Sequence, residues 1–357
     1  MPLVSVIVPT FNRAYCLART LDSALAQTHA EIEVIVVDDG SSDDTRAMVA
    51  SRYANDSRVR YFHQANGGVA KARNTGIAAA DGEFIALLDS DDVWHPWKIE
   101  LQVSCMDAFP DVVMVWTDME AMDPSGAIVD PAYIRTMYSA YSVFSERDLF
   151  PEAFPLKAIA PALEARVQDA RLLKGTIFSQ MIMGSLVHTS TVLLRKTCAD
   201  RVGGFNEALC FSGEDYDFHL RTCRQGPVGF IDLSTILYQR GMPDRLTRDE
   251  YRIHIATNFL NTVKPFIEKS RAEINLPQRM IDAMLAETYL WIGEVQLDIN
   301  EQADARRHLW RSLRYRFWQP RAWLLYGASF LPRGALSMLR ERYRWLKARV
   351  GRRTVRP

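Results

Sequence analysis

The stretches VSVIVPTFN (residues 4–12) and EIEVIVVDDGSSDDT (residues 31–45) decide the fold. Each is a run of β-branched residues that ends in polar ones, which is typical of strands buried on both faces of a parallel sheet. Between them, residues 14–26 predict a helix, and Asn12 is available as its N-cap. The apolar positions at helical spacing are Leu17, Leu21, Ala24 and Leu25.

The alternation of strand and helix continues along the chain. Ser41-x-x-Asp44 matches a capping box that opens a second helix. Residues 59–62 and 83–88 predict strands, residues 69–80 predict the helix between them, and Pro96 suits the first turn of the next helix. This order predicts right-handed βαβ units and a mostly parallel central sheet flanked by helices, as in a Rossmann-like α/β domain.

The composition is that of an ordinary soluble protein. The 357 residues, 48% of them hydrophobic, suggest two domains, or one larger domain with an appendage, and exclude disorder, collagen and a disulfide scaffold. The five scattered cysteines, with no CxxC pair, indicate a reducing cytosol and neither a disulfide framework nor a zinc site. The N-terminus does not resemble a signal peptide, and the longest apolar run, residues 322–331, is too short to span a bilayer.

Polar residues follow several predicted strands at the point where each strand ends. Asn12, Asp38, Asp39 and Ser41 do so, and so does the cluster Asp89-Ser90-Asp91-Asp92. Ligands bind at the carboxyl ends of the strands in such sheets, so we expect a site at this edge. Some of these carboxylates are explained as helix caps, namely Asp43, Asp44 and Asp92. Asp89 and Asp91 fit oxygen ligands of Mg²⁺ or Mn²⁺ better, because crowded carboxylates repel unless a cation neutralises them.

Arg73 falls on the apolar stripe of the helix predicted at residues 69–80. A guanidinium on the core side needs an anionic or planar partner, which is either the aspartate cluster or the base or phosphate of a ligand. Several nucleotide and hydrolase motifs are missing, namely GxxxxGK[ST], GxGxxG after the first strand, GxSxG and HExxH. His29, His63, His188 and His308 lack metal-ligand spacing and are predicted to be surface or satisfied core residues.

Five ordered motifs resemble family 2 glycosyltransferases with the GT-A fold. They are VSVIVPTFNR (4–13), VVDDGSSDDT (36–45), NGGVAKARNTG (66–76), FIALLDSDDVW (84–94) and GGFNEALCFSGEDYDFHLR (203–221). The resemblance implies a GT-A domain over residues 1–250, with a nucleotide-sugar half (1–120) and an acceptor half (121–250). Residues 251–357 are then a helical, basic, amphipathic appendage.

The resemblance also implies residue roles. Pro9, Thr10 and Asn12 would line the nucleotide pocket, Asp39 would bind the base and Arg73 would close over it. Asp89 and Asp91 match a DxD motif with Ser90 between them, in which Asp89 lies near the ribose and Asp91 binds Mn²⁺ or Mg²⁺. The metal would neutralise charge on the leaving nucleoside diphosphate.

The second half would supply the general base. Asp215 would take the proton from the acceptor hydroxyl, in a single displacement that inverts the anomeric carbon. Beside it, Glu214 is either a substrate contact or an acidic first-turn residue favoured by the helix dipole. Trp94 either stacks on a sugar or packs under its loop. Arg240, in the loop 240–247, is a candidate diphosphate contact. A QxxRW motif is absent, so we expect transfer of a single sugar.

Residues 130–185 predict an insertion that covers the acceptor site. Residues 251–320 predict helices that include one tetratricopeptide-like pair. Residues 301–357 hold 15 Lys and Arg against three acids, which gives this stretch a net charge of +12 within a neutral chain. Arginines alternate there with Trp and Tyr, which favours an anionic membrane interface over nucleic acid.

The sequence therefore predicts an inverting, metal-dependent, non-processive glycosyltransferase. The expected donor is a nucleoside diphosphate sugar, a UDP-sugar in the first place, and the acceptor is a saccharide or a lipid-linked sugar in cell-envelope polysaccharide or glycolipid synthesis. The expected location is the cytoplasm, at the inner face of the plasma membrane, with no nucleic-acid partner. The alternatives are a catalytically silent nucleotide-sugar or carbohydrate-binding module at the membrane, and a sugar nucleotidyltransferase.

Overall fold

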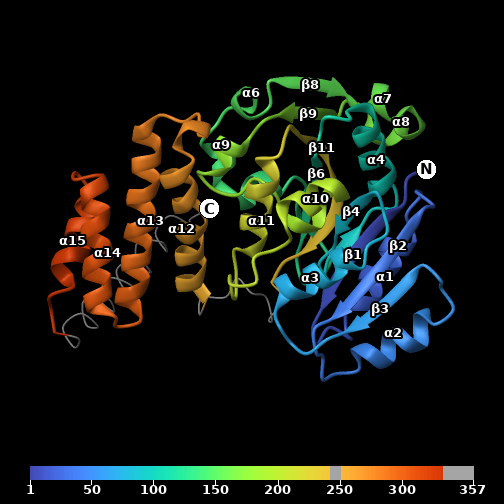
Figure 1. The fold of residues 1–357 in the computed structure, drawn as a ribbon, viewed down its shortest axis with the longest axis horizontal. Helices are drawn as coiled ribbons and strands as arrows, with labels where there is room; N and C mark the ends of the chain where they lie inside the picture. The colour runs from blue at the N-terminus through green and yellow to red at the C-terminus, as the bar shows by residue number, and fades with distance from the viewer. Residues whose placement is uncertain (242–250, 333–357) are drawn as a thin grey trace, which may run out of the picture. The chain divides into compact units, whose positions relative to one another are not determined.

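The computed structural model describes residues 1–241 and 251–332 and divides the chain into two compact units. Unit 1 comprises residues 1–246 and 270–274, and unit 2 comprises residues 247–269 and 275–357. Figure 1 shows unit 1 as a central sheet flanked by helices and unit 2 as a set of helices. The α/β class with a helical C-terminal region, predicted from the sequence, is confirmed.

The described strands of unit 1 form one mixed sheet in the order β3-β2-β1-β4-β10-β6-β11-β9-β8. Its first four strands are parallel, as the alternation of strands and helices predicts. β10 then runs antiparallel to both β4 and β6, while β11 is parallel to β6. The strands are β1 (Val4–Thr10), β2 (Ile32–Asp38), β3 (Val59–His63), β4 (Phe84–Leu87), β5 (Val93–Trp94), β6 (Met114–Met122), β7 (Ile128–Asp130), β8 (Glu152–Pro155), β9 (Arg171–Gly175), β10 (Leu193–Arg195) and β11 (Val228–Gln239).

The longer helices of unit 1 cover this sheet (Figure 1). They are α1 (Leu17–Leu25), α2 (Thr45–Tyr53), α3 (Val69–Ala78), α4 (Lys98–Ala108), α10 (Lys196–Val202) and α11 (Glu214–Cys223). Every residue of β1 and β2 is buried, as expected for central strands. α3 lies so close to them that a Cβ at Gly76 would stand 2.4 Å from Ile7 Cγ2, so this position requires glycine.

The predicted insertion, residues 130–185, contributes strands to the edge of the sheet. β9 pairs with β11, and β8 pairs with β9. Short helices connect these strands, which explains the weak periodicity of the sequence here. They are α5 (Ile134–Met137), α6 (Glu146–Leu149), α7 (Leu156–Ile159), α8 (Glu164–Val167) and α9 (Phe178–Met181).

Three predicted helix starts are wrong. Asn12 does not cap α1, whose N-cap is Cys16. The Ser41-x-x-Asp44 capping box does not form, because the Ser41 hydroxyl accepts the Asn12 N–H instead. Pro96 precedes α4, which begins at Lys98. In the first two cases a long-range contact at the sheet edge replaces the local cap.

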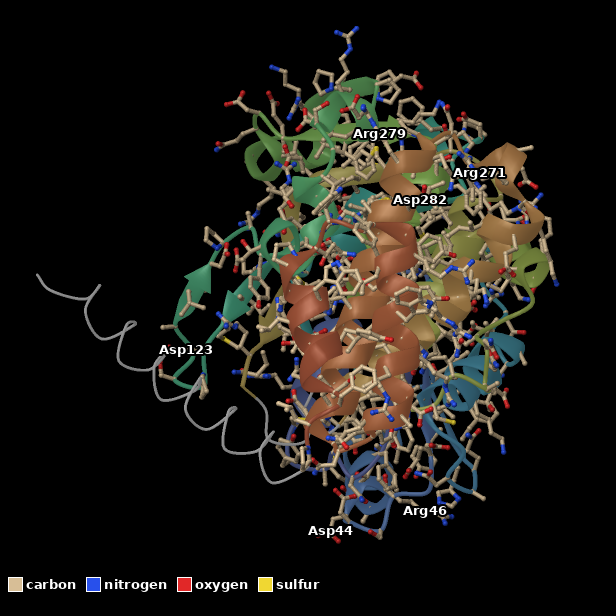
Figure 2. The ribbon with its side chains drawn as sticks, turned by 90° about the vertical axis from the view of Figure 1, so that its left-hand side faces the viewer. Asp44, Arg46, Asp123, Arg271, Arg279 and Asp282 are labelled. Carbon is tan, nitrogen blue, oxygen red and sulfur yellow. The ribbon has the colours of Figure 1, made fainter. Side chains whose placement is uncertain are left out.

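Unit 2 is built from α12 (Arg252–Lys269), α13 (Gln278–Asp298), α14 (Gln302–Tyr315) and α15 (Pro320–Ala328). Figure 2 faces these helices, with Arg279 and Asp282 marking the start of α13. The pair predicted from tetratricopeptide-like spacing corresponds to α13 and α14. A Cβ at Gly293 would stand 2.7 Å from Leu309 Cγ, so these helices touch at that glycine. Across residues 1–241 and 251–332, no helix combines the length and the apolar character needed to cross a membrane.

Candidate active site

A buried arginine joins three segments that are distant in the sequence. Arg73 lies on the inward face of α3 and is only 4% exposed. One guanidinium nitrogen donates to Asp89 Oδ1 after β4, and another donates to Glu214 Oε1 at the start of α11, both at 2.8 Å. The guanidinium also lies over the ring of Phe205, 5.1 Å from its centroid. The aspartate cluster and Glu214 therefore supply the anionic partners that an inward arginine needs.

These contacts set the protonation of the two acids. Burial favours the neutral form of Asp89, but the Arg73 guanidinium outweighs it and holds the pKa of Asp89 below its usual value. Glu214 behaves in the opposite way. Burial, and then the charge of the adjacent Asp215, raise the pKa of Glu214 to about 7, although Arg73 opposes the shift. Near neutral pH, Glu214 is thus poised between its neutral and charged forms.

Asp215, the proposed base, lies in the first turn of α11, as the sequence predicts. It is partly buried, and its Oδ1 accepts the backbone N–H of Tyr216 at 2.7 Å. Asp217 has a different role, because its carboxylate pairs with Arg221 one turn further along the helix at 2.6 Å. The side chains of α11 therefore divide between the site and the helix itself.

The acidic loop after β4 is held by its backbone. The Thr20 hydroxyl donates to the carbonyl oxygens of Ser90 and Asp92, at 3.0 and 2.9 Å. Arg13 Nη1 lies 3.2 Å from Asp91 Oδ2. Asp92 is buried rather than a helix cap; burial, and then the charges of Asp91 and Asp89, raise its pKa well above the usual range.

The donor chemistry of this loop suits a hard divalent cation. Asp89 and Asp91 offer carboxylate oxygens, which Mg²⁺ and Mn²⁺ prefer. Across the part of the chain that the structure describes, no three His, Cys, Asp or Glu side chains converge on one point. One or two carboxylates completed by substrate phosphates is a usual arrangement for Mg²⁺. The residues therefore fit a metal that binds together with a diphosphate.

The residues assigned to the nucleotide pocket lie at the ends of β1 and β2. Pro9 and Thr10 are buried in β1, and Thr10 Oγ1 has no hydrogen-bond partner among the described residues. Asn12 has a positive φ of 52° and accepts the Ser42 N–H through its side chain. Asp39 accepts hydrogen bonds at 2.9 and 2.7 Å from the N–H groups of Gly67 and Gly68. Asp39 thus shapes the loop that leads into α3.

Trp94 and Arg240, which the sequence assigns as possible substrate contacts, both contact other residues of the chain. Trp94 is 3% exposed, its indole N–H donates to the Ser190 carbonyl and its ring packs against Lys98. The structure thus shows Trp94 packed under its loop. Arg240 is exposed and lies over the ring of Tyr133. The rest of its loop, including Arg245, falls outside the described residues.

The side of the site formed by His188 and Tyr138 was not predicted from the sequence. His188 is buried, yet its Nδ1 has no hydrogen-bond partner among the described residues, so the prediction of a surface or satisfied histidine is wrong. Its ring lies edge-on to Tyr238. The phenol of Tyr138 also interacts with Asp215 and Asp89, and burial together with these charges raises its pKa. Three hydroxyl residues after His188 (Thr189, Ser190, Thr191), directly before a buried strand, were the available signal.

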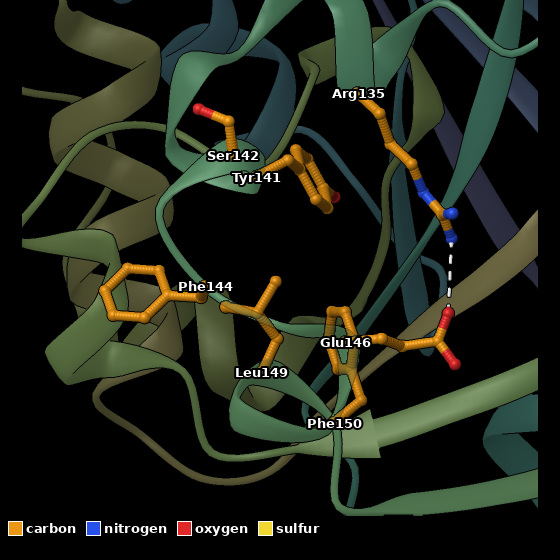
Figure 3. Close-up of a pocket in the computed structure, with 7 residues that line it drawn as sticks. All are labelled: Arg135, Tyr141, Ser142, Phe144, Glu146, Leu149 and Phe150. Atoms are coloured by element: carbon orange, nitrogen blue, oxygen red, sulfur yellow. Dashed lines mark ion pairs between the residues drawn. The ribbon is translucent and has the colours of Figure 1, made fainter.

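A separate pocket of about 200 Å³ lies beside the segment 135–150 (Figure 3). Arg135 and Glu146 form an ion pair at its rim, and aromatic rings supply much of its wall. Its lining residues are Arg135, Tyr141, Ser142, Phe144, Glu146, Leu149 and Phe150. None of the acids around Arg73 is among them.

Comparison with known proteins identifies the domain. Residues 5–144 match the family described as Glycosyl transferase family 2. An uncharacterized glycosyltransferase of Rickettsia felis is 31% identical over 240 residues, which cover 67% of this chain and 34% of that protein. A chondroitin synthase of Escherichia coli is 37% identical over 142 residues, 39% of this chain and 20% of that protein. The chain thus spans about a third of the length of the Rickettsia protein.

Solved structures share the fold. S. aureus TarS 1-349, in complex with UDP-GlcNAc, has a TM-score of 0.53 at 18% identity, over 92% of this chain and 90% of that one. The mannosyltransferase PcManGT from Pyrobaculum calidifontis, in complex with GDP-Man and Mn²⁺, has a TM-score of 0.51 at 20% identity, over 98% and 84%. Both likenesses support the GT-A architecture of unit 1.

Removing Arg73 should destabilise the fold in a pH-dependent way. Arg73→Met removes the cation that lowers the pKa of both Asp89 and Glu214. Each carboxyl must then stay charged without its partner or bind a proton, and we expect a loss of about 3 kcal/mol at pH 8. As the pH falls below 7, Glu214 binds a proton in the wild type as well, so neither protein needs the cation at Glu214 and the loss should shrink. Urea unfolding of the full chain at pH 8 and pH 5.5 measures both values.

Two further variants complete this test. Arg52→Ala removes an exposed pair with Asp22 and should cost less than about 1 kcal/mol at either pH. Adding Glu214→Gln to Arg73→Met should restore part of the stability at pH 8. A loss for Arg73→Met that equals that of Arg52→Ala, or that is the same at both pH values, contradicts the assignment.

Proposed function

Because the N-terminal region is a glycosyl transferase family 2 domain, we propose that this chain transfers one sugar from a nucleoside diphosphate sugar to an acceptor hydroxyl, with inversion at the anomeric carbon. The observation that carries the proposal is the convergence of Asp89, Arg73 and the Glu214–Asp215 pair at one edge of the sheet. The expected donor is a UDP-sugar, in line with the UDP-GlcNAc bound by the structural neighbour TarS. Pro9, Thr10, Asn12, Asp39 and Ser90 are its proposed contacts.

The protein's part in the reaction is to hold the donor and to move one proton. Asp215 accepts the proton of the acceptor hydroxyl while that oxygen attacks the anomeric carbon and the nucleoside diphosphate leaves. Arg73 holds the Asp89 and Glu214 carboxylates on either side of the site, so the donor loop and the base helix keep a fixed spacing. No covalent intermediate with the protein is needed.

Asp91, supported by Asp89, is the proposed ligand of Mn²⁺ or Mg²⁺. The oxygen-rich donor set supports this, as does the Mn²⁺ in the complex of PcManGT. When bound, a divalent cation neutralises the negative charge that develops on the leaving diphosphate. Arg13 Nη1 lies 3.2 Å from Asp91 Oδ2, so a cation bound at Asp91 would share this carboxylate with the arginine.

The acceptor is proposed to be a saccharide or a lipid-linked sugar in polysaccharide or glycolipid synthesis. The similarity to chondroitin synthase over residues of the family 2 domain supports a saccharide acceptor. Because QxxRW is missing from the sequence, we propose addition of a single sugar rather than continuous extension.

We also propose that unit 2 binds an anionic membrane surface. Aromatic rings of α14, α15 and the segments after them form a continuous chain of contacts, with centroids 5.3 to 6.5 Å apart. The members are Trp310, Phe317, Trp318, Trp323, Tyr326 and Phe330, which we call the aromatic patch. Trp318 is 86% exposed, and the neighbouring Leu324 is 73% exposed. A group of this size on a water-soluble surface marks an interaction site.

The positive charge around the aromatic patch indicates an anionic partner. Residues 301–332 contain six arginines and two acids, and the remainder of the chain to residue 357 adds further basic residues. Arg307 and Arg321 extend from the same helices and are well exposed. Trp beside Arg suits the headgroup level of an anionic bilayer, where rings enter the interface and guanidinium groups meet phosphates. Tyr343 and Trp345, which the sequence assigns to the same surface, fall outside the described residues.

The base assignment has a direct test. Asp215→Asn should lower turnover by at least about 100-fold while nucleotide affinity stays within twofold, because only proton transfer is lost. Asp217→Asn, two residues further along α11, is the matched control and should keep turnover per folded molecule within a few-fold. Release of nucleoside diphosphate from a UDP-sugar measures turnover. Near-normal turnover in Asp215→Asn refutes the assignment.

The membrane proposal is tested with the full chain and sedimentable vesicles. Replacing Trp318 and Leu324 by serine should lower the partition coefficient onto phosphatidylglycerol-containing vesicles by about tenfold, because less apolar surface enters the interface. The control replaces Ile128 and Val129, exposed apolar residues of β7, by serine and should bind as the wild type does. Equal binding by both variants, or equal binding to pure phosphatidylcholine, rejects the proposal.

A further inference from the structure

The segment His188–Thr191 links the donor loop to the base helix. The Asp89 N–H donates to Ser190 Oγ at 3.0 Å, which ties the segment to the acidic loop. On its other side, Thr189 Oγ1 lies 3.3 Å from His219 Nε2 on α11. Both contacts are made by neighbouring residues of one short turn, η3 (Thr189–Thr191). The turn therefore fixes the position of the residue directly before it, between the loop after β4 and helix α11.

His188 is the residue so placed. It is 8% exposed, and its ring packs edge-on against Tyr238 with the centroids 5.2 Å apart. Asp89 and Asp215 both lie close enough to act on the imidazole electrostatically. Within the described residues, its Nδ1 has no hydrogen-bond partner although it is buried. A polar atom that is buried and unpaired destabilises the fold, so such an atom calls for an explanation.

A substrate hydroxyl explains it best. A hydroxyl both donates and accepts, so it can pair with Nδ1 in either tautomer of the imidazole. The reacting sugar of the donor must lie between Asp89, which is on the donor side, and Asp215, which meets the acceptor oxygen. The turn after His188 joins the Asp89 loop to α11, which carries Asp215. His188 is therefore placed beside that sugar rather than beside the nucleotide base, which is assigned to the ends of β1 and β2.

We propose that His188 binds a hydroxyl group of the donor sugar through Nδ1 and so helps to select and orient that sugar. The proposal rests on the proposed function, since it needs a nucleotide-sugar donor at this site. It also predicts how a substitution of His188 affects the stability of the protein. Because Nδ1 is unpaired without substrate, removing it should not lower the stability of the ligand-free protein. Removing a histidine that stabilises the fold would lower it.

The test compares nucleotides with nucleotide sugars. Calorimetry with Mn²⁺ measures the dissociation constants of UDP, UDP-GlcNAc, UDP-glucose, UDP-galactose, GDP and GDP-mannose for the wild type, His188→Phe and His188→Asn. His188→Phe keeps a ring against Tyr238 but no nitrogen, and His188→Asn returns a polar atom near the position of Nδ1. His63→Phe, at the exposed end of β3, is the control.

We expect His188→Phe to leave the affinity for the nucleoside diphosphate within twofold and to weaken that of the matching nucleotide sugar by about tenfold. His188→Asn should recover most of this loss, and the melting temperature of His188→Phe should not fall. An unchanged ratio of the two affinities, an equal loss for both ligands, or a lower melting temperature without a sugar-specific loss overturns the inference alone. A wild-type chain that binds no nucleotide overturns the proposed function, and this inference with it.

Discussion

The double ion pair of Arg73 is the interaction on which the rest of the site depends. Taking a guanidinium and two carboxylates out of water is costly, and the cost is offset only when each charge has a close partner. Arg73 meets Asp89 and Glu214 at 2.8 Å, so removing Arg73 leaves two carboxyl groups without their cation. The pairing fixes helix α3, the loop after β4 and helix α11 relative to one another. The loop proposed to bind the donor and the helix that carries the proposed base therefore keep a fixed geometry.

The same interaction organises protons in a crowded acidic region. Asp89 stays ionised because of Arg73, while Asp92 and Glu214 bind protons more readily than free carboxylic acids do. Arg73 therefore offsets part of the repulsion among these acids, and the raised pKa values of Asp92 and Glu214 offset another part. A cation bound at Asp91, as proposed, would share that carboxylate with Arg13.

Sequence reasoning reached the sheet edge but not the contacts across it. The strand ends after β1, β2 and β4 follow from local patterns, and Arg73 follows from helical spacing. Its partner Glu214, 141 residues away, follows from no local rule, and neither does the burial of Trp94 against Ser190. Asn12 and Ser41 look like helix caps in isolation, but they bond to each other across the edge. His188 escaped because its neighbours Thr189 and Ser190 acquire meaning only when the turn meets Asp89 and His219.

The measurement that tests the central claim most directly is calorimetric titration of the full chain with UDP, GDP, TDP and CDP, each with Mn²⁺ and again with a chelator. The account predicts that one nucleotide, UDP in the first place, binds with Mn²⁺ and loses most of its affinity with the chelator. It also predicts that Asp91→Ala binds this nucleotide weakly even with Mn²⁺. Binding of no nucleotide, or binding that neither the chelator nor Asp91→Ala affects, would contradict it.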